Sequence, residues 1–138
     1  MQIKTITKGN LLIAQPSLFD YTFNRTVVFL VDHNEFGTIG FILNKPMHIQ
    51  LNTFVSELDS EFPVYEGGPV ETDNLYYLHK RPDLISDSEH IVGDLYWSGD
   101  YEDIKTSINN KLIQPNEIRF YLGYSGWGEN QLQNEIDE

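Results

Sequence analysis

The chain has 138 residues, 40% of them hydrophobic, with 9 Lys and Arg against 21 Asp and Glu and a formal net charge of -12. This size and composition predict one packed domain over residues 1–138, and the charge disfavours binding to nucleic acid. Because the sequence contains no cysteine, disulfides, thiolate nucleophiles and cysteine metal sites are excluded.

The first third of the chain predicts the centre of a sheet. The apolar run at 11–14 is expected to form a short buried strand that stops at Pro16, since proline donates no hydrogen bond to a sheet. The continuous apolar run at 26–31 predicts a strand covered on both faces. Turn residues at 33–37 and a second strand at 38–43 complete a predicted antiparallel hairpin, which ends at residues 44–46.

The remainder predicts short helices between further strands. A helical stripe over 51–58 predicts a first helix with Asn52 as its cap, and a second is expected to start near Ser98 or Asp100. A third begins at Gln131. Strands are predicted at 74–79, 89–92, 95–97 and 118–122. Grouped strands with few helices predict an α+β fold: a large mixed or antiparallel sheet with barrel character and two to three short helices.

Ser125 is the one candidate nucleophile in a glycine-rich turn. The hydrolase pattern G-x-S-x-G fails here, because Trp127 stands at the position of the last glycine. The pair of an acid and then a histidine that would complete a catalytic triad also does not follow the serine. Asp32, His33 and Glu35 lie in a predicted turn without the spacing of a metal-binding helix. We therefore assign no catalytic residue, no metal site and no cofactor; whether the chain is an enzyme stays open, and the lack of a complete catalytic constellation favours a noncatalytic protein.

Two glycine-rich loops are predicted to serve the backbone. Gly67 and Gly68 lack the Lys-Ser/Thr of a phosphate-binding loop, so they indicate a chain that passes close to another element, with Pro69 stiffening its exit. Gly123 and Gly126 are interpreted in the same way, as residues that let a strand turn tightly into the last helix.

Several segments in a fixed order resemble the bacterial AlgH/YqgE family. They include Gly9 to Pro16, Phe23 to Val28, Gly40 to Pro46, Gly67 to Val70, and Leu122 to Trp127 followed by Glu135 and Ile136. The resemblance implies a compact α+β fold with barrel character in the bacterial cytosol, and the label of a transcriptional regulator. It also implies that residues 1–138 lack the C-terminal extension usual in the family.

The function predicted first is a noncatalytic regulatory or interaction module in the cytoplasm, with a protein or small molecule as its partner. The alternative is a small-molecule or nucleotide-binding, enzyme-like domain. Direct DNA binding and membrane insertion are not expected, whereas a sheet edge near Trp127 is expected to be unpaired and to favour self-association. The candidate binding residues are Arg25, His33, Asn34, Asn44, Pro46, Gly67, Gly68, Pro69 and Trp127.

Overall fold

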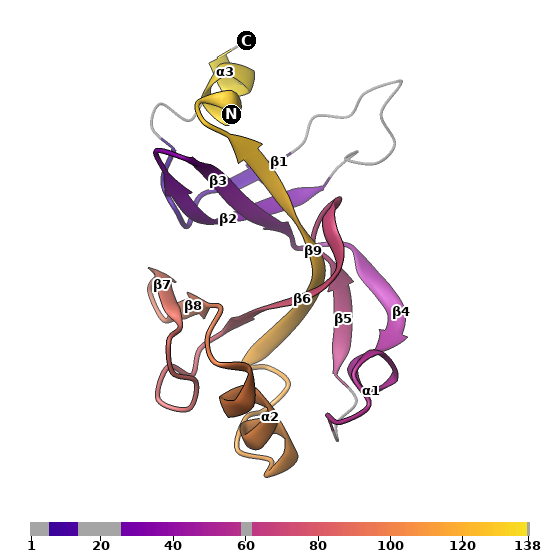
Figure 1. The fold of residues 1–138 in the computed structure, drawn as a ribbon. Helices are drawn as coiled ribbons and strands as arrows, with labels where there is room; N and C mark the ends of the chain where they lie inside the picture. Colours follow the sequence, from indigo (N-terminus) through magenta and orange to yellow (C-terminus); the bar gives the residue numbers. More distant parts are fainter. Residues whose placement is uncertain (1–5, 14–25, 59–61, 138) are drawn as a thin grey trace.

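The computed structural model describes residues 6–13, 26–58 and 62–137, which form nine strands and three short helices. The sheet curls into a half-barrel in the order β1-β2-β3-β9-β6-β8-β7, with β4 and β5 attached beside β9 (Figure 1). The elements are β1 (Leu11–Ile13), β2 (Val27–Asn34), β3 (Gly37–Ile42), β4 (Pro46–Gln50), α1 (Leu51–Phe54), β5 (Pro63–Glu66), β6 (Val70–His79), β7 (Glu89–Val92), β8 (Leu95–Trp97), α2 (Tyr101–Asn109), β9 (Ile118–Gly128) and α3 (Gln131–Asp137). The predicted α+β fold is confirmed.

The predicted hairpin is present and its first strand is central. β2 pairs with β1 on one side and with β3 on the other, both antiparallel. Val28 and Leu30 pack into the core beneath α3, while Phe29 and Val31 pack inside the curl of the sheet. A strand buried on both faces explains why this run contains no polar residue until Asp32.

The long strand β9 runs through the middle of the molecule and joins its two halves (Figure 1). In the first half of β9, successive side chains point to opposite faces: Phe120 packs toward the core under α2, and Tyr121 packs into the curl. Gly123 has a φ of 74°, a conformation that favours glycine. Beyond it the alternation shifts by one residue, so that Tyr124 again faces the curl and Trp127 faces the core beneath α3.

The chain crosses over β9 at this glycine. β5 lies parallel to β9, whereas β6, which follows β5, pairs with β9 antiparallel. The connection passes over the strand: Gly67 N–H donates to the Leu122 carbonyl at 2.8 Å, and Val70 pairs with Tyr124. A Cβ on Gly68 would overlap the backbone of Tyr124. The expectation of a close backbone passage at Gly67 and Gly68 is therefore confirmed.

The strand predictions need two corrections. β1 is an edge strand, with Leu11 45% and Ile13 63% exposed, and not the buried strand expected from its apolar letters. The run around Gly123 and Gly126 is not a turn into a helix, because β9 continues to Gly128. Pairing with β3 extends the strand through residues that their glycine content marked as a turn.

The predicted helices lie at the correct places in the sequence, but the observed helices are shorter than predicted. α1 has four residues, and its N-cap is Gln50 rather than Asn52. α2 begins after Asp100, whose side chain accepts a 2.8 Å hydrogen bond from the Glu102 N–H, as an N-cap should. Ile104 and Ile108 are buried in its inner face. No helix in the described part of the chain is long and apolar enough to cross a membrane.

Candidate functional site

A trough of about 370 Å³ lies across the strands β2, β3 and the outer half of β9. Residues paired across neighbouring strands share a face of the sheet, so Asp32, Ile39 and Gly126 lie in one row. Gly37 and Gly128 are paired in the same way in the next row. Glycine leaves no side chain above the sheet, and the floor of the trough is therefore largely backbone.

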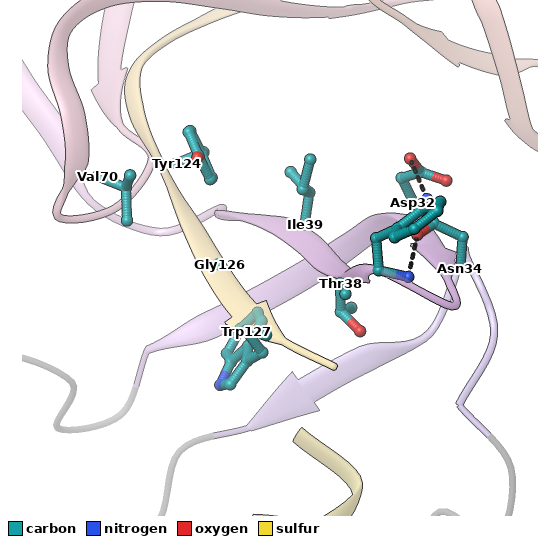
Figure 2. Close-up of a pocket in the computed structure, with 11 residues that line it drawn as sticks. Asp32, Asn34, Thr38, Ile39, Val70, Tyr124, Gly126 and Trp127 are labelled. Atoms are coloured by element: carbon teal, nitrogen blue, oxygen red, sulfur yellow. Dashed lines mark hydrogen bonds between the residues drawn. The ribbon is translucent and has the colours of Figure 1, made fainter. Parts of the chain in front are cut away.

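The walls of the trough differ in character. Tyr124 and Val70 stand at one end, and Asp32 and Asn34 stand at the other (Figure 2). Asn34 Oδ1 accepts the Phe36 N–H at 2.8 Å, a local turn bond that fixes the tip of the hairpin. The Asn34 amide also donates to the Asp32 carboxylate at 3.4 Å. One end is thus aromatic and aliphatic, and the other end is acidic.

The opposite face of the same strands belongs to the core. Thr38 and Trp127 are paired and point away from Tyr124 and Ile39 (Figure 2). The Thr38 hydroxyl lies 2.7 Å from His33 Nδ1, which accounts for the predicted site residue His33 as a local hydrogen-bonding partner. Trp127 packs against the buried cluster that contains Leu132.

Ser125 has the surroundings of a structural residue. It is buried within β9, and its hydroxyl donates to the Gly67 carbonyl at 3.2 Å. This bond ties the crossing connection to the strand below it. Among the residues that the structure describes, no group of three or more His, Asp or Glu could hold a metal ion.

The predicted binding residues do not gather in one place. Asn34 and Trp127 both line the trough. The side chain of Asn44 accepts the Val27 N–H at 2.9 Å at the base of the hairpin, and Pro46 pairs with Tyr65 between β4 and β5. Gly67 and Gly68 form the crossing and Pro69, exposed, follows them, while Arg25 lies outside the described residues.

A second cavity of about 580 Å³ lies between the two halves of the curl. It involves Arg119 and Tyr121, which alternate with the core residues of β9 and so share the inner face of that strand. Sequence reasoning missed both. The signal available was their spacing of two within a strongly apolar strand, which places them together on one face.

Comparison with known proteins gives the chain its relatives. The AlgH-like family profile matches residues 11–138. The chain belongs to the AlgH-like family. A UPF0301 protein of Chlorobaculum parvum is 41% identical over 138 residues, covering 99% of this chain and 74% of the relative. A UPF0301 protein of Cytophaga hutchinsonii is 44% identical over 135 residues, covering 96% and 74%.

Two solved structures share this AlgH-like fold. The solution structure of AlgH from Pseudomonas aeruginosa superposes with a TM-score of 0.77 at 31% identity, covering 99% of this chain and 76% of that one. A crystal structure of a protein from Corynebacterium diphtheriae also gives 0.77, at 19% identity and with 99% and 74% covered. The AlgH-like fold is thus retained where most of the sequence has changed.

Proposed function

We propose that this AlgH-like chain is a noncatalytic interaction module that binds an extended, basic segment of a partner protein along the outer half of β9. The observation that carries the proposal is the edge of β9 beside the trough. From Gly126 to Gly128 the strand pairs with β3 on one side, and no other described strand pairs with it there. An extended segment added at such an edge forms main-chain hydrogen bonds and places alternate side chains over the sheet.

The trough is suited to one long side chain of that segment. Its backbone floor at Gly126 and Gly128, with Ile39 and Tyr124 beside it, offers apolar contact to an aliphatic stem. The half-buried Asp32 carboxylate lies at the far end and forms no ion pair with the described residues. An arginine or lysine matches both ends of the trough, because its stem is apolar and its head is cationic.

Charge selects the partner. A net charge of -12 attracts a basic segment and repels both nucleic acid and a second copy of the chain. The expected self-association through this edge is therefore the less favourable use of the same surface. A regulatory role would act through a protein partner and not through DNA.

The test uses a defined probe, the peptide acetyl-Thr-Arg-Thr-Val-Thr-Arg-Thr-amide, titrated into the chain by calorimetry. We expect Asp32→Asn to weaken binding about 5- to 10-fold, since a charge-assisted hydrogen bond to the carboxylate is lost. Gly126→Val should also weaken binding, because it fills the floor, where a Cβ would meet only the edge of the Tyr124 ring at 3.0 Å.

The matched control is Asp94→Asn, which removes the same charge from an exposed position in the turn between β7 and β8. It should leave the affinity unchanged. A peptide with citrulline in place of both arginines should bind much more weakly. Equal losses from Asp32→Asn and Asp94→Asn would mean nonspecific attraction to an acidic surface and would overturn the proposal.

A further inference from the structure

The second cavity combines apolar walls with a few polar side chains at one side. Its apolar walls come from both halves of the curl, with Phe29 and Leu43 on one side and Leu78 and Leu95 on the other. At about 580 Å³ it falls within the size range of small-molecule sites, which are mostly apolar with a few polar groups that fix orientation.

Tyr121 supplies a hydroxyl whose proton has no acceptor. The residue is 0% exposed, and the hydroxyl donates to no described residue. The ring is held by stacking on Phe41, with centroids 4.9 Å apart. Burial raises the pKa of Tyr121 to about 12, so the group remains a neutral donor at physiological pH. A buried donor without an acceptor destabilises a fold, and a bound acceptor would remove that cost.

Two cations line the cavity, and one of them, Arg119, lies beside this hydroxyl. The Arg119 guanidinium lies over the Tyr65 ring at 4.2 Å, and its Nη1 donates to the Leu43 carbonyl at 3.1 Å. Its positive charge and its approach as a donor to the hydroxyl oxygen both act to lower the pKa of Tyr121, against the larger effect of burial, so the two groups are close. Lys80 also lines the cavity, and within the described residues neither cation forms an ion pair.

The acidic group in the same wall is already occupied. Glu117 pairs with Arg81 at 3.0 Å and accepts the Gln114 N–H at 2.8 Å. His79 is also committed: its Nδ1 accepts the Arg81 N–H at 3.1 Å, and its Nε2 lies 3.2 Å from the Ser98 carbonyl. Burial lowers the pKa of His79, which keeps the ring neutral. The polar groups of the cavity that can meet a ligand therefore include a hydroxyl donor and two cations.

We propose that this cavity is a binding site for an amphipathic monoanion, an aliphatic or aromatic carboxylate whose apolar body lies against Phe29 and Leu78 and whose carboxylate meets Tyr121 and Arg119. The apolar walls suit the body, and the local cations suit one negative charge in a chain of net charge -12. A polyphosphate would add more negative charge than these cations offset. This site is separate from the trough and does not depend on the proposed partner binding.

The test is calorimetry of the full chain with decanoate, decanol and acetate at neutral pH. Decanoate should bind at least about ten-fold more tightly than decanol, which has the body without the charge. Acetate, which has the charge without the body, should give no measurable binding at the same concentration. Equal affinity for decanol and decanoate would overturn the proposal, because the cavity would then recognise only the apolar chain of the ligand and not its carboxylate.

Variants separate binding from stability. Tyr121→Phe should weaken decanoate binding about five-fold or more and yet raise the Tm of the ligand-free chain by about 2–6 °C, since it removes an unsatisfied buried hydroxyl. Arg119→Gln should weaken binding, whereas Lys111→Gln, which removes an exposed charge elsewhere, should not. Unchanged decanoate affinity in Tyr121→Phe would show that the hydroxyl does not face the ligand and would contradict the assignment.

Discussion

Gly68→Ala and Gly123→Ala should each lower the free energy of unfolding by about 3 kcal/mol or more, a large fraction of the roughly 5–15 kcal/mol that stabilises an ordinary domain. A methyl group on Gly68 would overlap the Tyr124 backbone, and one on Gly123 would overlap the Gly68 carbonyl. Neither clash is with the end of a flexible side chain, so the crossing itself must move apart. Urea unfolding followed by tryptophan fluorescence gives the free energy of unfolding.

Two other glycines serve as controls for this prediction. Gly93 has a φ of 57° but open space around it, so Gly93→Ala should cost only about 1–2 kcal/mol of backbone strain. Gly126→Ala would meet only the Tyr124 ring, at 3.0 Å, and should be better tolerated than either crossing variant. If all four variants lost similar stability, overlap at the crossing would not be the cause.

Phe41→Ala is expected to lower the free energy of unfolding by about 3–5 kcal/mol, the usual range for truncating a buried aromatic ring. The Phe41 ring is fully buried and contacts three others, stacking on Tyr121 and packing near Tyr76 and Trp97 at centroid distances of 5.7 and 6.0 Å. It joins the two halves of the curl. The loss should also change the fluorescence of Trp97 in the folded state.

The matched control is Phe36→Ala at the tip of the same hairpin. Phe36 is 81% exposed, so its removal should change stability by no more than about 0.5 kcal/mol. A loss below about 1 kcal/mol in Phe41→Ala would instead mean that the aromatic cluster contributes little to joining the halves.

The elements that sequence reasoning predicted well are those with a strong local pattern. The run from Val27 to Val31 could only be a strand buried on both faces, and Asp100 with Glu102 and Asp103 marks a helix start by capping and charge. β1 was misjudged because three apolar residues cannot distinguish an edge strand from a central strand. That distinction depends on which strands lie beside it.

The candidate sites depend on pairing between distant strands, which single-sequence patterns do not contain. Glycine predicts freedom of the backbone, but only the register of β9 with β3 turns Gly126 into the floor of a trough. The crossing at Gly68 and Gly123 likewise brings together residues more than fifty positions apart. Asn34 and Trp127 were predicted as site residues and both line the trough, although the Trp127 side chain points to the opposite face of β9.

The most direct test of the proposed function is an amide chemical-shift titration of the labelled chain with the arginine peptide. We expect the largest changes in two stretches, Tyr124 to Gly128 of β9 and Asp32 to Ile39 of the hairpin, which together form the trough and its open edge. The same experiment with Asp32→Asn should give much smaller changes at equal peptide concentration. Changes spread over the acidic surface, or centred on Lys80 and Arg119, would contradict binding at the edge of β9.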